Sequence, residues 1–454
     1  MPNRTNWSNL PWLLVNRTDL TIEREQCRDE GLDLSSVEAE FDALTAGELT
    51  TPEDLARAEA LLDRTASLPL VEDYPWREPS DLPCIRTRRP AALELPARAL
   101  DEATLLDKAL GGWQGRCSGC LLGKPVEGKR AWMIEKYLQT QKRWPLDRYF
   151  SAACADAEIA KECTFDGIAA TLCEEGITCM VEDDDTNYTV LGLALVKQHG
   201  PNFTPVEVAR FWLDNLPVGH VCTAERAAYR NLVNMIGPPE SASYRNVYRE
   251  WIGAQIRADF FGYMNPGNLE RAAEFAWRDA SISHVKNGIY GEMWVAAMLA
   301  AAYICDDVET VLRAGLSQIP AECRLTKAIL QTIEQYRSGL AYEEAVADLQ
   351  SRWDENNQHH WCHTISNAEI VAIALLWGEQ DFERTICRAV MPGFDTDCNG
   401  ATAGSILGIM LGAQRLPEKW IAPLQDTLLT GVAGYHRVSL NQMAQDTVSL
   451  REQR

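Results

Sequence analysis

The stretch GGWQGRCSGCLLGKPVE, residues 111–127, carries glycine at every fourth position from its first residue. Residues four apart lie on one face of a helix, so this face would be a strip without side chains that a second backbone can approach closely. Such strips are familiar from membrane helices. Arg116 and Lys124 interrupt the stretch, which favours instead a soluble helix at the crowded centre of a core. Cys117 and Cys120 form a lone CxxC pair, which predicts packing residues rather than zinc ligands.

The chain from Asp101 onward is predicted to be almost wholly helical. Three segments carry apolar residues at helical spacings of three, four and seven, namely 288–304, 325–349 and 367–377. Their separators are Pro/Gly pieces such as 237–239, and no alternating run bounded by turn residues predicts a sheet. We therefore expect an all-α core without a fixed-period repeat.

The first hundred residues differ in character from the rest. Residues 17–65 are charged and helix-prone, and Thr51-Pro52-Glu53-Asp54 has the hydroxyl cap, early proline and acids typical of a helix start. Six prolines between residues 69 and 96 exclude a long helix there. We predict a mainly helical, Pro-rich extension over residues 1–100 and a main domain over residues 101–454.

Composition narrows the classes of partner. The chain has 454 residues, 46% of them hydrophobic and 24% charged, as in ordinary soluble proteins. Its formal charge of −22 disfavours nucleic acid and anionic membranes as partners. No apolar run is long enough to span a membrane, and the N-terminus lacks the pattern of a secretory leader. The 14 scattered cysteines then indicate free thiols in a reducing cytoplasm.

Three successive acids, Asp183, Asp184 and Asp185, stand with Thr186 directly before an apolar helical run. Within a helix, adjacent side chains point about 100° apart and cannot share an ion, but at a helix start they can converge. Carboxylate and hydroxyl oxygens are the ligands of Mg²⁺. The alternative is an over-charged helix cap, for which one aspartate would suffice.

A second acidic cluster has the same design. Asp395 and Asp397 in GFDTDCNG, residues 393–400, precede the small-residue helix ATAGSILGIMLGA. A glycine-rich turn with an aspartate cap accounts for either acid but not easily for both. This cluster is therefore a second candidate for metal ligation.

Histidines mark two further places. Ser283 and His284 precede a predicted helix, where a histidine can bind phosphate or shuttle protons but more often caps a helix or fills the core. His359, His360 and His363 lie in a polar segment that enters another helix. A zinc site is conceivable there, and we expect an exposed loop.

Taken together and in this order, these elements resemble the ADP-ribosylglycohydrolase family, which includes the dinitrogenase-reductase-activating glycohydrolases. That family's pattern is a glycine helix ending in Gly-Asp-Ala-Leu-Gly-x-Pro-x-Glu, then Ser/Thr-Asp-Asp-Thr, a Ser-His segment and Gly-Asp-Thr-Asp-Thr. The counterparts here are GCLLGKPVE at 119–127, DDDT at 183–186, SH at 283–284 and FDTDC at 394–398. The resemblance covers roughly residues 105–435.

The resemblance implies an orthogonal multi-helix bundle with two Mg²⁺ ions in a central cleft, hydrolysing the bond at C1″ of ribose in ADP-ribosyl groups. Asp184 and Asp185 match the family's first aspartate pair, and Asp395 and Asp397 match the second. Glu127 matches a glutamate at the opening of the metal site.

Three positions depart from the family pattern. Cys120 replaces an aspartate, Asp183 replaces a Ser/Thr ligand, and Cys398 replaces a threonine. Cysteine is a poor ligand for Mg²⁺, so one of the two metal positions is expected to be weakened or lost, with Asp183 as a stronger oxygen ligand in compensation. We therefore expect one or two Mg²⁺ ions, with Mn²⁺ as a substitute.

The sequence thus predicts a metal-dependent glycohydrolase acting on a small-molecule or ADP-ribosylated substrate, with its oligomeric state open. Two alternatives remain: a ribosyl glycohydrolase acting on a nucleoside-like metabolite, and a non-catalytic ADP-ribose-binding protein. The predicted metal ligands are Asp183, Asp184, Asp185, Asp395 and Asp397; the catalytic residues are Glu127, Asp185 and Asp397; the substrate contacts are Ser283, His284 and Arg257.

Overall fold

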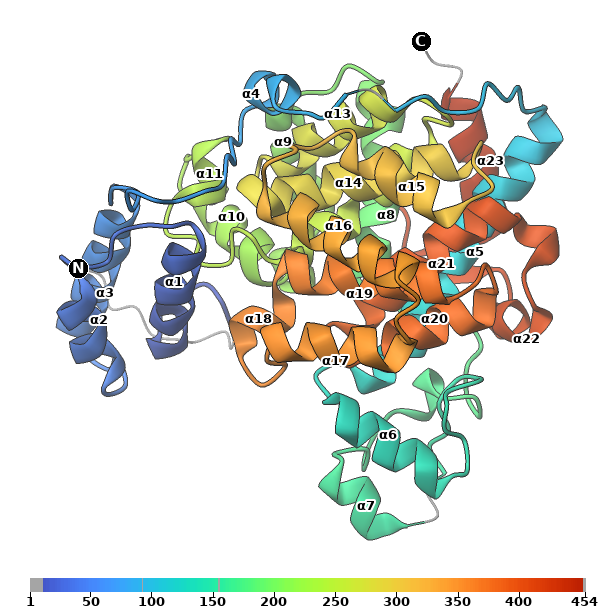
Figure 1. The fold of residues 1–454 in the computed structure, drawn as a ribbon, viewed down its shortest axis with the longest axis horizontal. Helices are drawn as coiled ribbons and strands as arrows, with labels where there is room; N and C mark the ends of the chain where they lie inside the picture. Colours follow the sequence, from blue (N-terminus) through green and yellow to red (C-terminus); the bar gives the residue numbers. More distant parts are fainter. Residues whose placement is uncertain (1–10, 92, 154–155, 452–454) are drawn as a thin grey trace.

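The computed structural model describes residues 11–91, 93–153 and 156–451 and confirms the all-α class (Figure 1). The first ten residues, on which the expectation of no leader rests in part, lie outside the described residues. Across the described ranges, no helix is both long and apolar enough to cross a membrane.

The N-terminal helices form a small group at one side of the main body (Figure 1). They are α1 (Arg17–Asp29), α2 (Glu38–Thr45) and α3 (Pro52–Thr65), whereas the six-residue α4 (Leu82–Thr87) lies apart from them, next to the main body. The predicted start of α3 is confirmed: Thr51 caps the helix, its hydroxyl accepting from the Asp54 amide at 3.1 Å, and Pro52 is the first residue. The division of the chain into two parts at residue 100 stays a prediction.

The main body is a bundle of many helices (Figure 1), with a small hairpin near its C-terminal end. Its first half consists of α5 (Glu102–Gly123), α6 (Ala131–Thr140), α7 (Ala157–Glu162), α8 (Asp184–His199), α9 (Pro205–Asn215), α10 (Thr223–Val233), α11 (Glu240–Ser243), α12 (Asp259–Tyr263) and α13 (Leu269–Ala280). Its second half consists of α14 (Lys286–Ala302), α15 (Val308–Leu316), α16 (Arg324–Arg337), α17 (Tyr342–Arg352), α18 (Gln358–Cys362), α19 (Thr364–Trp377), α20 (Phe382–Val390), α21 (Thr396–Leu411), α22 (Glu418–Ile421), β1 (Thr427–Leu429), β2 (Arg437–Ser439) and α23 (Leu440–Arg451).

Helices α5 and α21 run antiparallel with their backbones in contact, as the glycine spacing predicts. Gly119 faces Gly400, and a Cβ atom on either residue would overlap the carbonyl oxygen of the other. The same relation holds for Gly115 with Gly404, so no larger residue fits at these crossings. This contact places the C-terminal end of α5 against the N-terminal end of α21, where the Thr396 hydroxyl donates to the Gly123 carbonyl at 2.9 Å.

The helical periodicity over 325–349 is divided between two helices, α16 and α17, because Gly339 between them has a φ of +81°, which a continuing helix does not allow. One local prediction, the absence of any sheet, is corrected. A two-stranded antiparallel hairpin, pairing Thr427 with Ser439, was not predicted. Its strands are three residues long, too short to display an alternating pattern.

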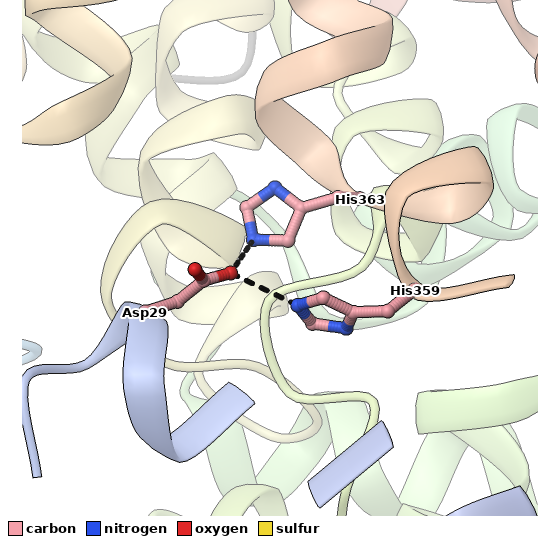
Figure 2. Close-up of side chains that lie close together, drawn as sticks. All are labelled: Asp29, His359 and His363. Atoms are coloured by element: carbon pink, nitrogen blue, oxygen red, sulfur yellow. Dashed lines mark hydrogen bonds and ion pairs between the residues drawn. The ribbon is translucent and has the colours of Figure 1, made fainter. Parts of the chain in front are cut away.

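The histidine segment is buried rather than exposed, so that prediction was wrong. His359 and His363 are 1% and 0% exposed, because the end of α1 covers them and Asp29 points between the two rings (Figure 2). Asp29 Oδ2 lies 2.9 Å from Nε2 of His359 and 3.7 Å from Nε2 of His363. These contacts join the N-terminal helices to the main body.

The hydrogen bonds of the two rings argue against zinc at this cluster. The Trp251 indole N–H donates to Nδ1 of His359 at 3.0 Å, and the Ile365 amide donates to Nδ1 of His363 at 3.1 Å. Both Nδ1 atoms are therefore acceptors, and a neutral ring then carries its proton on Nε2. Both Nε2–H groups face the Asp29 carboxylate and have no lone pair for a metal (Figure 2).

Candidate metal centre

Six carboxylates gather where the C-terminal end of α5 meets the N-terminal ends of α8 and α21. We call this set the acidic centre; it consists of Glu127, Asp183, Asp184, Asp185, Asp395 and Asp397. Its ligand atoms form three overlapping groups, each with all atoms within 4.8 Å of one another. The groups are Cys120–Asp183–Asp185, Asp185–Asp397–Cys398 and Glu127–Asp395–Asp397. The structure thus brings together both acidic clusters of the sequence.

At the start of α8, one of the three successive aspartates caps the helix and the other two do not. Asp183 has extended backbone angles, φ −154° and ψ 148°, and its carboxylate accepts from the Asp185 amide at 2.9 Å. One aspartate therefore caps the helix, as the alternative explanation required. That explanation leaves Asp184 and Asp185 unexplained, and both belong to the acidic centre.

At the start of α21, neither aspartate is explained by capping alone. Asp395 precedes the helix but its side chain makes no capping hydrogen bond. Asp397 is only 3% exposed, and its Oδ1 atom has no hydrogen-bond partner among the described residues. A buried carboxylate oxygen without a donor is costly, and a bound cation would remove that cost.

The carboxylates of the acidic centre shift one another's proton affinity upward. Burial, and then the charges of Asp183 and Asp397, raise the pKa of Asp184 to about 7. Burial raises the pKa of Asp185 and of Asp395 well above the usual range. The pKa of Glu127 is also strongly raised, first by the charge of Asp397 and then by burial of its carboxyl group, although the residue as a whole is exposed. The centre therefore favours binding a proton or a cation.

Arg116 holds Asp185 in place. Its guanidinium is fully buried and donates to Asp185 Oδ1 at 3.2 Å, to the Asp185 carbonyl at 2.7 Å and to Asp259 Oδ2 at 2.7 Å. The sequence had marked Arg116 only as an interruption of the glycine helix. A charged residue within an otherwise small and apolar buried helix was the signal that could have identified this role.

Two thiols stand among the acids. Cys398 Sγ lies 3.2 Å from Asp185 Oδ2, and Cys120 shares a group with Asp183 and Asp185. Burial raises the pKa of both thiols well above their usual range, and the neighbouring carboxylates raise it further. They are therefore neutral sulfur donors, poorly suited to a hard cation.

The three groups consequently fit a metal ion unequally. The group Glu127–Asp395–Asp397 offers only carboxylate oxygens, the ligands that Mg²⁺ and Mn²⁺ take. The other two groups each contain a thiol. The all-oxygen group is the better site for a hard divalent ion.

The predicted substrate residues lie away from solvent. Arg257 is 1% exposed, donates to Glu225 at 2.6 Å and also pairs with Asp279. His284 is 0% exposed, lies 2.8 Å from the Ser283 hydroxyl through Nδ1, and has a pKa lowered well below its usual range by burial. These contacts give both residues a role in the core, and their contact with substrate stays a prediction.

Comparison with known proteins agrees with this architecture. The family model described as ADP-ribosylglycohydrolase matches residues 101–454. The chain belongs to the ADP-ribosylglycohydrolase family. The resemblance inferred from the motifs is thereby confirmed.

Two individual matches accompany the family match. An uncharacterized protein of Archaeoglobus fulgidus is 24% identical over 183 residues, which is 40% of this chain and only 55% of that protein. The chain thus matches little more than half the length of this relative. A solved structure named as an ADP-ribosylglycohydrolase-related protein complex has 17% identity and a TM-score of 0.48, over 77% of this chain and 99% of that chain.

Proposed function

We propose that the protein is a metal-dependent glycohydrolase that cleaves the bond at C1 of ribose in an ADP-ribosyl group. The observation that carries this proposal is buried Asp397, whose Oδ1 atom has no partner in the described part of the chain and which has a carboxylate oxygen within 4.8 Å of ligand atoms of Asp395 and Glu127. In a chain of this family, a buried carboxylate group that lacks donors is best explained as a cation site.

Glu127, Asp395 and Asp397 would hold the ion, and Asp185 and Asp184 stand next to them in the same acidic centre. A divalent ion bound there, Mg²⁺ or Mn²⁺, would polarise ribose hydroxyls and lower the pKa of a bound water. We expect this ion to be required for turnover.

The protein's own carboxylates supply the rest of the chemistry. Cleavage at C1 passes through a state with positive charge on the ribose, which the negative field of the acidic centre stabilises. Glu127 is the solvent-exposed member of the centre, so it lies where substrate and water would reach the bound ion. Arg116 keeps Asp185 in a fixed orientation through three hydrogen bonds.

The direct test measures release of ADP-ribose from ADP-ribosyl-arginine and from an ADP-ribosylated protein, with added Mn²⁺ or Mg²⁺ and with a chelator. We expect release that depends on the ion and that falls strongly in Glu127→Gln. A nucleoside panel run in parallel tests the small-metabolite alternative, which gains support if nucleosides are cleaved while ADP-ribosyl groups are not.

The thiols at Cys120 and Cys398 favour a second candidate, a non-catalytic ADP-ribose-binding protein. They place neutral sulfur in two of the three ligand groups. Calorimetry that shows ADP-ribose binding without hydrolysis at saturating Mn²⁺ would support this candidate and refute the enzymatic proposal.

A further inference from the structure

A lysine stands inside the acidic centre. Lys124 follows directly after α5, and its ammonium forms an ion pair with Oδ2 of Asp183. Its charge also lowers the pKa of Glu127, of Asp184 and of Asp397. The ammonium is therefore close enough to act on acids at the start of α8 and at the start of α21. The metal chemistry proposed above assigns no role to a lysine at this position.

Asp183 and Asp185, which together with Cys120 form what we call the inner half of the centre, have their carboxylate oxygens occupied by protein donors. Asp183 Oδ1 accepts from the Asp185 amide at 2.9 Å, and Asp183 Oδ2 takes the ammonium of Lys124. Asp185 Oδ1 accepts from Arg116 at 3.2 Å, and Asp185 Oδ2 lies 3.2 Å from the Cys398 thiol. Each of these four carboxylate oxygens already has a partner.

The outer half differs in that a ligand oxygen is left over. Asp397 Oδ1 is buried and has no hydrogen-bond partner among the described residues. Its neighbours Glu127 and Asp395 add only carboxylate oxygens. This end is therefore open to a second cation, whereas the inner end already contains one.

Cys120, the third residue of the inner half, also disfavours a divalent ion there. Cys120 completes the group with Asp183 and Asp185, and a thiol is a weak ligand for Mg²⁺ or Mn²⁺. With a thiol as its third ligand atom and a lysine beside it, the inner position offers a hard divalent ion only two carboxylates, and the oxygens of both already accept from protein donors.

We propose that the ammonium of Lys124 acts as a built-in cation for the inner half of the acidic centre, so that the chain binds a single divalent ion, at Glu127, Asp395 and Asp397. This inference rests on the proposed function, since it concerns the same site. Lys124 neutralises and positions Asp183. The single ion supplies the metal chemistry described under the proposed function.

The test counts Mn²⁺ ions on the metal-free full-length protein, by equilibrium binding and by electron paramagnetic resonance. We expect one Mn²⁺ per wild-type chain and the spectrum of an isolated ion. The double variant Lys124→Met/Cys120→Asp removes the ammonium and adds an anionic ligand, so it is expected to bind two ions that show the spin coupling of a pair. Lys129→Met is the matched control, because Lys129 donates instead to the Thr164 carbonyl at 2.7 Å, and it should bind one ion.

A single substitution gives an independent readout. In Lys124→Gln, loss of a nearby positive charge should tighten binding of the outer Mn²⁺ by about tenfold, because the ammonium repels the ion. A lysine with only a structural role would on removal weaken binding or leave it unchanged. Either of those results in folded Lys124→Gln, or two Mn²⁺ ions on the wild-type chain, would overturn the inference.

The outcome is separable from that of the proposed function. If the wild type binds two ions and releases ADP-ribose, the inference fails while the function stands. If it binds one ion, the Lys124→Gln chain binds Mn²⁺ more tightly and no ADP-ribose is released from any substrate, the inference stands and the proposed function fails.

Discussion

Two buried carboxylate clusters in this molecule use the same residue types to opposite effect. One is the acidic centre; the other, which we call the docking cluster, joins α1 to the main body and comprises Gln26, Asp29, Glu250, Arg324, His359 and His363. Glu250 in the docking cluster accepts from Arg324 at 2.7 and 2.8 Å, from Gln26 at 2.7 Å and from the Asn287 amide at 2.9 Å. Asp397 in the acidic centre keeps an oxygen without a donor.

The pKa values of the two clusters move in opposite directions although both are buried. Burial alone would raise the pKa of Glu250, but the charge of Arg324 and its hydrogen bonds hold that pKa well below the usual range. For Asp395 burial also raises the pKa, and the nearby charges of Asp397 and Glu127 raise it further. The number of donors and cations, rather than burial, therefore distinguishes a cluster that stabilises the fold from one prepared to bind a ligand.

The largest effect is expected from emptying the acidic centre. Asp395→Ala/Asp397→Ala should abolish Mn²⁺ binding and lower turnover by about a thousandfold or more, the equivalent of losing several kcal/mol of charge stabilisation in the transition state. Its free energy of unfolding without metal should not fall, because two mutually repelling buried acids are removed. Calorimetry with Mn²⁺ and an ADP-ribose release assay measure both effects, and full activity in this variant would refute the metal-site assignment.

The reverse pattern is expected in the docking cluster. Glu250→Gln should lower the free energy of unfolding by about 3–5 kcal/mol, because it breaks a buried ion pair and leaves the Arg324 charge uncompensated. Mn²⁺ binding should be unchanged. Glu334→Gln, an exposed position on α16, is the control and should change stability by no more than about 0.5 kcal/mol. Urea unfolding of the wild type, Glu250→Gln and Glu334→Gln measures these differences. Equal stability of all three would refute the proposed difference between the two clusters.

The two clusters should also respond to pH with opposite sign. Asp184 has a folded pKa of about 7 against an ordinary value of 3.8, so the metal-free folded state holds a proton that the unfolded state releases. This contribution to stability is lost as the pH rises through that window. Glu250 has a lowered folded pKa, so its contribution is present above its ordinary value of 4.5 and is lost as the pH falls through the folded pKa.

Adding metal tests the direction of the pH dependence at the acidic centre. Mn²⁺ at about 100 times its dissociation constant should raise the free energy of unfolding by about 2.7 kcal/mol near pH 8. The gain at the same Mn²⁺ concentration should be smaller near pH 5, because protons compete for the same carboxylates. Unfolding curves with and without Mn²⁺ across this range measure the difference. A gain that is independent of pH would show that the ion binds elsewhere.

The smallest effect is expected at Asp29. Asp29→Asn removes the charge that accepts a hydrogen bond from Nε2 of His359 and lies 3.7 Å from Nε2 of His363, which should cost about 1–2 kcal/mol of unfolding free energy (Figure 2). Zn²⁺ should change the stability of wild type and variant by the same amount, since neither ring offers Nε2 as a ligand. A Zn²⁺-dependent stabilisation present in the wild type and absent in Asp29→Asn would show that this cluster binds metal.

The sequence by itself determined those features that depend only on residues close together in the chain. The helix start at Thr51 and the glycine face of α5 were predicted, and a helix cap among Asp183–Asp185 was the stated alternative to metal binding, because each depends on backbone geometry within one or two turns. The two acidic clusters were found for the same reason. Their gathering into one centre followed from the family resemblance rather than from local pattern.

Only the tertiary structure decided which partners those residues have. Lys124 pairs with Asp183 across 59 residues, and Cys398 contacts Asp185 across 213 residues. The burial of His359, His363 and Arg257 likewise depends on helices distant in sequence. A hydrogen bond or ion pair has a strength set by distance and surroundings, and neither is encoded in local spacing. For that reason the sequence located the acids, while the fold determined which of their oxygens remain free for a metal.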